Sequence, residues 1–276
     1  MKCEKFVAFP IFSVFLVMGF VYLVTVFIFI EDWKGLRSTA GSLNAMIFTV
    51  LASLSLLSFL VCVLTDPGGV PPAYMPDIEH SGDSDPVAKK SVAHLSHCGK
   101  CAAYKPPRAH HCRVCRRCVL RMDHHCLWIN NCVGHRNYKA FFVLVIYATV
   151  ASMYSSIIIV LWAFQKEFNF NGRTPLKIFY ITCGIMIVGL SLTLGTLLSW
   201  HIYLITQNMT TIEYYEGKRA AWLARKSGQN YRHPFNVGGY KNVTLVLGPN
   251  VMKWLCPTAV NHIKDGVDFP TARESL

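Results

Sequence analysis

The chain has 276 residues, of which 53% are hydrophobic and only 15% are charged, and its formal net charge is +12. Soluble globular proteins usually carry about 25% charged residues, so this composition argues against a soluble protein and indicates a membrane protein. The basic excess needs no nucleic-acid partner to explain it, because lysine and arginine beside membrane spans interact with anionic lipid.

Four long apolar stretches without charged residues follow one another along the chain, at residues 6–30, 43–64, 140–164 and 178–205. Each reaches the roughly 20 residues that a helix needs to cross a bilayer. We therefore expect four transmembrane helices. The first is expected to be a retained anchor, because its apolar core exceeds the roughly 7 to 15 residues of a secretory signal.

The polar segments between and after these stretches define the expected organisation and orientation. Most of the net positive charge lies at the N-terminus, in the middle loop 66–139 and in the tail after residue 205. The positive-inside tendency then places both termini and the middle loop in the cytosol. We expect five regions: helices 1 and 2 in 1–65, a cytosolic linker in 66–96, a cysteine-rich domain in 97–139, helices 3 and 4 in 140–205, and a cytosolic C-terminal region in 206–276.

Two smaller features lie in the second half of the chain. Gly184, Gly189 and Gly195 in the fourth span are expected to permit close packing of helices. The C-terminal region contains a strand-like segment at 243–247.

The most informative pattern is an internal repeat of 14 residues in a segment that holds seven of the eleven cysteines. Two copies of C-x2-C-x9-H-x6-C interleave, and they are Cys98, Cys101, His111 and Cys118, then Cys112, Cys115, His125 and Cys132. Three thiolates and one imidazole complete a structural zinc site, so the repeat predicts two structural Zn²⁺ ions. A different grouping, with Cys98, Cys101, Cys112 and Cys115 in one all-cysteine site, is disfavoured by the identical spacing of the copies.

Cys126 remains after these eight ligands are assigned. A third copy of the repeat would place its partners at Ile129, Lys139 and Ile146, none of which is a zinc ligand of this type. Cys126 is then either an inert buried thiol or a nucleophile.

The neighbours of Cys126 favour a nucleophile, because the local sequence is Asp123-His124-His125-Cys126. In an extended segment alternate side chains share a face, so His124 and Cys126 would point together while His125 turns toward zinc. His124 can take the thiol proton, and Asp123 can orient the imidazole and stabilise its charged form. We predict Cys126, His124 and Asp123 as the catalytic residues.

This tetrapeptide, in a cysteine-rich domain between the second and third spans, resembles the signature of the DHHC family of protein S-acyltransferases, or palmitoyltransferases. Asp66-Pro67-Gly68 resembles the DPG motif of the family, Thr210-Thr211-Ile212-Glu213 its TTxE motif, and residues 235–242 its C-terminal aromatic-and-asparagine segment. The family usually has proline after the signature cysteine, where this chain has Leu127.

The resemblance implies an all-α polytopic membrane protein with four transmembrane helices and a cytosolic zinc-stabilised cysteine-rich domain between helices 2 and 3. It implies that Cys126 accepts a long-chain acyl group such as palmitate from acyl-CoA and passes it to cytosolic cysteines of membrane-associated proteins. It also implies residence in the Golgi, the ER or the plasma membrane, and contact of Thr211 with the region of Asp123. Arg116, Arg117 and Arg121 are candidates to meet the CoA phosphates.

Two other functions remain open from the residues alone. A RING-like ubiquitin ligase also binds two zinc ions through interleaved ligands, but a RING normally closes with a C-x2-C pair, which is missing here. A scaffold with a folded zinc domain and weak catalysis is kept open by Leu127.

Overall fold

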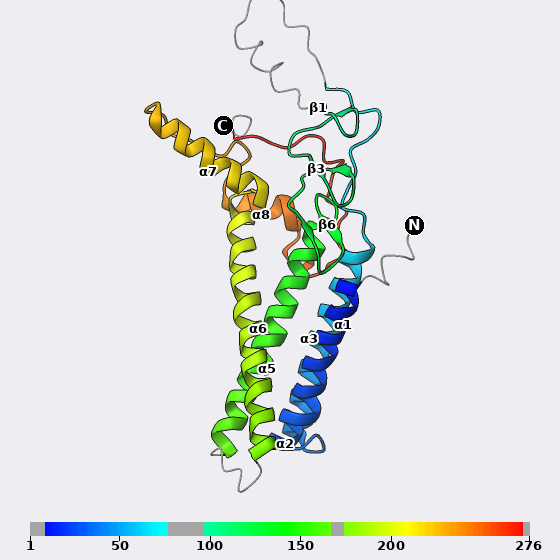
Figure 1. Ribbon diagram of the computed structural model, residues 1–276, viewed down its shortest axis with the longest axis vertical. Helices are drawn as coiled ribbons and strands as arrows, with labels where there is room; N and C mark the ends of the chain where they lie inside the picture. Colours follow the sequence, from blue (N-terminus) through cyan, green and yellow to red (C-terminus); the bar gives the residue numbers. More distant parts are fainter. Residues whose placement is uncertain (1–8, 77–96, 167–173, 273–276) are drawn as a thin grey trace, which may run out of the picture.

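The computed structural model describes residues 9–76, 97–166 and 174–272. The larger part of the expected linker, residues 77–96, lies outside this range. In the described part, four long helices form an elongated bundle, and the cysteine-rich segment and the C-terminal region lie together at one end of it (Figure 1). The predicted fold class is confirmed, because four helices are long and apolar enough to cross a membrane.

The first span is one continuous helix made of three parts, which are α1 (Phe9–Leu23), the π-helical segment η2 (Val24–Ile30) and α2 (Glu31–Lys34). It ends at Gly35, whose φ of 75° is readily adopted only by glycine. The second span, α3 (Thr39–Leu64), begins at Ser38, whose hydroxyl caps the backbone N–H of Gly41.

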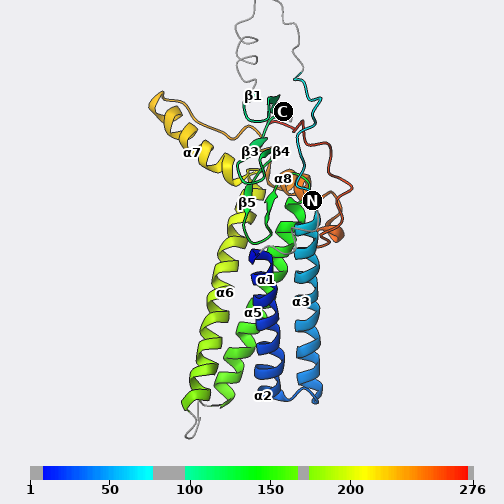
Figure 2. The same ribbon diagram turned by 45° about the vertical axis from the view of Figure 1, so that its right-hand side comes forward.

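The third and fourth spans are α5 (Tyr138–Lys166) and α6 (Thr174–Thr206). Helices of 26 to 32 residues reach at least about 39 Å at roughly 1.5 Å per residue, more than the roughly 30 Å of a hydrocarbon core. α5 packs against both α3 and α6, and all four spans run along a common direction (Figure 2).

Polar side chains join the helices inside the bundle. Thr25 and Ser155 share a buried hydrogen bond of 2.6 Å, and Tyr154 donates to Asn44 at 2.6 Å. The expectation for the glycines holds only in part. A Cβ at Gly184 would lie 3.4 Å from Ile159, but Gly189 and Gly195 have nothing within 4 Å of that position, so their predicted packing role is wrong.

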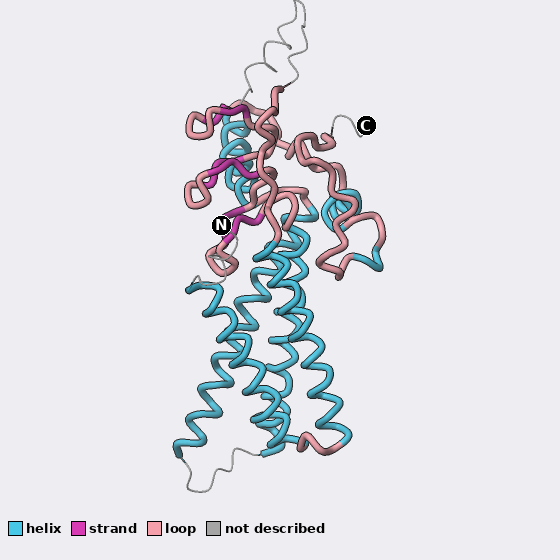
Figure 3. Tube along the Cα trace, turned by 90° about the vertical axis from the view of Figure 1, so that its right-hand side faces the viewer, coloured by secondary structure: helices cyan, strands magenta, loops and turns pink. Residues whose placement is uncertain are grey.

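The cysteine-rich domain consists of three short antiparallel hairpins stacked above the bundle (Figure 3). They are β1 (His97–Cys98) with β2 (Ala103–Tyr104), β3 (His110–Cys112) with β4 (Arg117–Val119), and β5 (His124–Cys126) with β6 (Asn131–Val133). The helices of the described chain therefore lie in its spans and its C-terminal region, and the strands lie in the cysteine-rich domain.

The backbone of this domain repeats three times, although the zinc-ligand pattern repeats only twice. Ala102, Arg116 and Asn130 occupy the same place in their hairpin turns, and each has a positive φ between 45° and 53°. Cys126 pairs with Asn131 in the register in which Cys98 pairs with Ala103 and Cys112 with Arg117. Cys126 thus occupies, in a third hairpin, the position of the first predicted zinc ligand of each set.

The C-terminal region contains α7 (Thr211–Lys226), α8 (Gly239–Leu247) and the short 3₁₀ helix η3 (Val251–Lys253). The strand expected at 243–247 is wrong, because this segment is the last part of α8. Val246 and Leu247 lie together on one side of α8 and pack into the core at the end of α5, so tertiary packing overrides the β propensity of the segment.

Candidate active site

The two predicted ligand sets come together in space as the repeat predicts. Each set is three thiols and one imidazole whose ligand atoms lie within 4.8 Å of one another, and these are the two groups of this kind in the described residues. In the first set, Nδ1 of His111 is 3.2 Å from the sulfur of Cys101 and 3.5 Å from that of Cys98. The all-cysteine grouping is not formed.

The geometry of both sets fits zinc. Tetrahedral zinc with bonds of about 2.0 to 2.3 Å separates its ligand atoms by roughly 3.5 to 3.8 Å. In the second set, Nδ1 of His125 lies 3.5 to 3.6 Å from the sulfurs of Cys112, Cys115 and Cys132. The two sets could therefore each hold a metal ion, as zinc fingers do.

The strand β5 divides its three side chains between two environments. His125 points into the second ligand set, while His124 and Cys126 point to the other face and lie next to each other. This is the alternation that the sequence predicts for an extended segment. A metal ion at His125 would fix the backbone between the two other residues.

Asp123, His124 and Cys126 form a connected set of polar groups. Nδ1 of His124 is 2.7 Å from Oδ2 of Asp123, which is only 1% exposed. The thiol of Cys126 lies close enough to the imidazole to affect its pKa, and Cys126 is itself buried at the top of the helix bundle. The structure therefore brings the three predicted residues together.

The electrostatics of this set favour a charged His124. Burial lowers the pKa of His124, but the hydrogen bonds and negative charge of Asp123 and Cys126 outweigh burial and raise this pKa to about 9. Burial raises the pKa of Asp123, but hydrogen bonds from His124 and Thr211 outweigh it and hold this pKa below its ordinary value. Asp123 is thus an anion beside a proton-holding imidazole.

The C-terminal region supplies a further contact to this set. The backbone N–H of Thr211 donates to Oδ1 of Asp123, and the Thr211 hydroxyl donates to Oδ2, each at 2.9 Å. Thr210 and Glu213 form a capping box at the start of α7, which places the first N–H of that helix toward Asp123. The contact expected for Thr211 is confirmed.

Sequence comparisons agree with this arrangement. Residues 92–218 match the family model described as DHHC palmitoyltransferase. The chain is 63% identical over 258 residues to "Probable protein S-acyltransferase 15" of Arabidopsis thaliana, with 94% of this chain and 100% of the relative covered. The chain belongs to the DHHC palmitoyltransferase family.

Two further relatives in the DHHC palmitoyltransferase family share less identity with the chain. "Probable protein S-acyltransferase 16" of Arabidopsis thaliana is 50% identical over 97% of this chain and 94% of the relative. "Probable protein S-acyltransferase 13" of the same plant is 32% identical over 87% of this chain and 82% of the relative. These matches give no support to the RING-like alternative.

The DPG motif of this DHHC palmitoyltransferase connects the end of α3 to the second hairpin. Asp66 accepts a hydrogen bond from the N–H of Gly68 at 2.8 Å and pairs with Arg117 at 2.8 Å. The carbonyl of Gly68 accepts from the N–H of Leu120 at 2.9 Å. Gly68 has a φ of 99°, which explains why a glycine stands there.

The aromatic-and-asparagine segment connects the C-terminal region to α6. The amide of Asn242, which is fully buried, donates to the carbonyl of Thr206 at 2.7 Å. The ring of Phe235 lies 4.5 Å from the guanidinium of Arg108. The first contact joins α8 to α6, and the second joins the segment to the cysteine-rich domain.

Arg108, which sequence reasoning missed, completes the link between the domain and α7 together with Glu213. Arg108 and Glu213 form a buried pair with bonds of 2.7 and 2.8 Å, and Arg108 also donates to Asn208. Glu213 was visible only as part of the TTxE motif. Arg108 carried no signal, because an arginine in a basic loop looks like a solvated charge.

The arginines suggested for CoA binding have different environments. Arg121 is 5% exposed. Its guanidinium donates to the side-chain oxygen of Asn208 and lies over the ring of Tyr138, so Arg121 is not a surface charge. It lines a cavity of about 1180 Å³ between the cysteine-rich domain and residues 262–271. Arg117 is engaged by Asp66, whereas Arg116 is exposed. Neither Arg116 nor Arg121 forms an ion pair within the described part of the chain.

The departure from the family signature, Leu127, directly follows Cys126, but its side chain is exposed. Leu127 and Trp128 are exposed in the turn of the third hairpin, where the carbonyl of Leu127 accepts from the N–H of Asn130 at 3.1 Å. Leucine there leaves the contacts of His124 and Cys126 in place.

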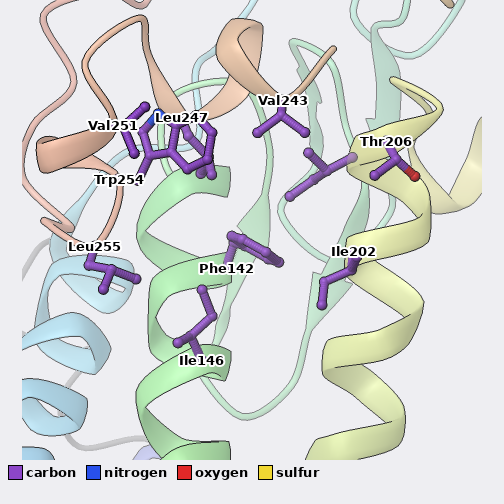
Figure 4. A pocket seen from close by; sticks show the side chains of 10 residues that line it. Phe142, Ile146, Ile202, Thr206, Val243, Leu247, Val251, Trp254 and Leu255 are labelled. Atoms are coloured by element: carbon purple, nitrogen blue, oxygen red, sulfur yellow. The ribbon is translucent and has the colours of Figure 1, made fainter. Parts of the chain in front are cut away.

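An apolar pocket of about 430 Å³ lies beside this domain, where the ends of α5 and α6 meet α8 (Figure 4). Phe142, Ile202, Leu247 and Trp254 contribute to its walls, and Thr206 is its polar member. None of Asp123, His124 and Cys126 lines it, so it is separate from the reacting groups.

Proposed function

We propose that this protein S-acyltransferase transfers a long-chain fatty acyl group from acyl-CoA to cysteine thiols of membrane-associated proteins, with Cys126 as its nucleophile. One observation carries the proposal: the thiol of Cys126 meets an imidazole that is held by a buried carboxylate. This is the arrangement by which a protein activates a cysteine nucleophile.

In the first half-reaction, the proton of the Cys126 thiol passes to His124, whose raised pKa of about 9 favours holding it. The thiolate attacks the thioester carbonyl of acyl-CoA, so that a bond forms between Cys126 and the acyl carbon while the bond to the CoA sulfur breaks. His124 returns its proton to the departing CoA thiolate. Asp123 keeps Nδ1 of His124 protonated and leaves Nε2 to face the thiol.

In the second half-reaction, the thiol of the protein substrate gives its proton to His124 and attacks the acyl-enzyme. The bond between Cys126 and the acyl carbon breaks, and the proton passes to the Cys126 thiolate. The enzyme returns to its starting state. One base therefore serves both steps, and no redox partner is needed.

The two metal sites have a structural role in this proposal. Cys98, Cys101, His111 and Cys118 would hold one Zn²⁺, and Cys112, Cys115, His125 and Cys132 would hold the other. Bound zinc would crosslink the hairpins, and sites with four protein ligands leave no position for substrate. Cys126 is then the one thiol of the domain that is free to react.

The position of Cys126 suits a membrane-bound acyl group. Its hairpin lies at the end of the bundle, and Cys126 packs with Phe141 and Phe59 of the spans. An acyl chain could enter the apolar bundle while CoA stays in water. We place this end in the cytosol, where acyl-CoA is made available, because the middle loop and the tail carry most of the positive charge.

Labelling of the purified protein with an alkyne-tagged palmitoyl-CoA tests the proposal. Wild type should acquire a label that hydroxylamine removes, and Cys126→Ala should acquire none. Cys256→Ala is the matched control, because Cys256 is an exposed thiol outside the cysteine-rich domain and its loss should leave the label on Cys126. An unlabelled wild type with intact metal content would favour a scaffold, and a label that survives in Cys126→Ala would move the nucleophile elsewhere.

A further inference from the structure

An ionisable side chain inside a transmembrane helix is costly, so its presence there indicates a function. His201 of α6 is such a residue and is only 2% exposed. No zinc pattern includes it, and it belongs to none of the motifs of the sequence. Its contacts therefore have to explain why a histidine stands there.

The first contact of His201 is with the start of α5. Nδ1 of His201 is 3.0 Å from the hydroxyl of Tyr138, which is 1% exposed. The guanidinium of Arg121 lies 5.1 Å from the centre of the Tyr138 ring and donates a hydrogen bond to Asn208. A buried tyrosine hydroxyl needs a hydrogen-bond partner, so this bond gives the His201 ring a defined orientation.

The second contact of His201 is with the candidate base. The ring centres of His201 and His124 are 6.2 Å apart, and the planes are inclined by 43°. Phe141 meets both rings edge to face, at 5.0 Å from His201 and 5.3 Å from His124. His124 is thus bounded by Asp123 at one nitrogen and by two aromatic side chains along its ring.

These two kinds of restraint act on different motions of His124. The hydrogen bond to Asp123 fixes the position of Nδ1, but the imidazole can still rock about this bond. Packing against Phe141 and His201 restrains the plane of the ring, which decides whether Nε2 points at Cys126. A base displaced by about 1 Å can lose on the order of 100-fold in rate.

We propose that His201 is a positioning residue for acyl transfer: its ring, anchored by Tyr138, holds the imidazole of His124 in the plane in which it meets both Asp123 and Cys126. The inference rests on the proposed function, because it assigns His201 to the base of that reaction. It makes the fourth span part of the machinery, and not only a membrane anchor.

Three substitutions distinguish the contribution of the His201 ring from the contribution of its hydrogen bond to Tyr138. His201→Ala removes both, His201→Asn keeps a polar atom near the Tyr138 hydroxyl but removes the ring, and His201→Phe keeps a ring but removes the bond. Tyr138→Phe removes the anchor alone. Ser199→Ala is the matched control in α6, because Ser199 is exposed and its hydroxyl donates to the carbonyl of Gly195 in its own helix.

The measurement is the rate of acylation of Cys126 over a range of acyl-CoA concentrations, together with zinc content. His201→Ala and His201→Asn should lose about 10-fold or more of the limiting rate with KM for acyl-CoA changed less than twofold. His201→Phe and Tyr138→Phe should lose less than either of them. All variants should keep two zinc ions, and Ser199→Ala should match wild type.

Three outcomes would overturn the inference. One is a limiting rate of His201→Ala equal to that of wild type. Another is a loss that appears in KM alone. The third is a loss of zinc that parallels the loss of rate in His201→Ala and also in His201→Phe, which would make the role purely structural. A wild type that forms no acyl-enzyme would instead mean that the proposed function has failed.

Discussion

Thr211 donates two hydrogen bonds of 2.9 Å to the carboxylate of Asp123, although the two residues are 88 positions apart in the sequence. One donor is the backbone N–H at the start of α7, and the other is the Thr211 hydroxyl. The two membrane spans α5 and α6 lie between these residues in the chain. The C-terminal region therefore helps to fix the anion that orients His124.

Thr211→Val should slow acyl-enzyme formation, because it removes the hydroxyl donor while keeping the shape of the side chain. A buried acceptor that loses a partner costs about 1–3 kcal/mol, which corresponds to roughly 5- to 150-fold in rate if the loss falls on the activated state. Thr211→Ser keeps the hydroxyl and should restore most of the rate. Single-turnover acylation measures this, and equal rates for valine and threonine would show that the backbone N–H suffices.

Cys126→Ser should abolish the acyl-enzyme and keep two zinc ions per chain, because it removes a nucleophile and no ligand. Cys132→Ala should lose metal and express poorly, since structural zinc can contribute about 10 kcal/mol or more of folding free energy. Elemental analysis of the purified variants gives the metal content. Release of one equivalent of zinc from Cys126→Ser would show that Cys126 is a zinc ligand. It would contradict the assignment of the other eight residues to two complete sets of four ligands.

Glu213→Gln should lower thermal stability, because it leaves the guanidinium of Arg108 buried without its counter-charge. The two side chains are 1% and 8% exposed, and breaking such a pair typically costs about 3–5 kcal/mol. The double variant Arg108→Met with Glu213→Leu should lose less than the sum of the single variants. Thermal unfolding in detergent measures both, and additive losses would indicate that the pair does not couple.

Lys139→Met should loosen the segment after α8 while leaving the bundle folded. The Lys139 ammonium donates to the carbonyls of Leu247, Lys253 and Ala259 at 2.7, 3.0 and 2.8 Å. Charge-assisted bonds contribute about 1.5–3 kcal/mol each, so their loss should expose residues 248–259 to protease and to hydrogen exchange. Lys241→Met is the control, because Lys241 is exposed. Equal protection of this segment in both variants would contradict the prediction.

Tags fused to the N-terminus and to the C-terminus should both be digested when protease is added to sealed vesicles whose cytosolic face points outward. The expectation follows from an even number of spans and from the charge distribution. A tag beyond a known luminal domain serves as the protected control. Protection of either tag from the protease would contradict this topology, and with it the proposal that Cys126 lies on the cytosolic side, where acyl-CoA is available.

Local features of the amino-acid sequence by themselves determined the spans, the metal-ligand sets and the candidate reacting residues. A transmembrane helix satisfies its own backbone hydrogen bonds, so its apolar length is readable in a single segment. The two ligand sets repeat because each hairpin turn brings nearby residues together, which is why the spacing of the cysteines and histidines predicts the members of each set. The face shared by His124 and Cys126 follows from the alternation of side chains in a strand.

Only the tertiary structure decided how these parts join. The helical state of 243–247 depends on the core that receives Val246 and Leu247, and the roles of Arg108 and Lys139 depend on partners more than 100 residues away. The contact of His201 with His124 requires the end of α6 to lie beside the third hairpin. Spacing and hydropathy report on neighbours along the chain, whereas these contacts arise where helix ends, hairpins and the C-terminal region pack together.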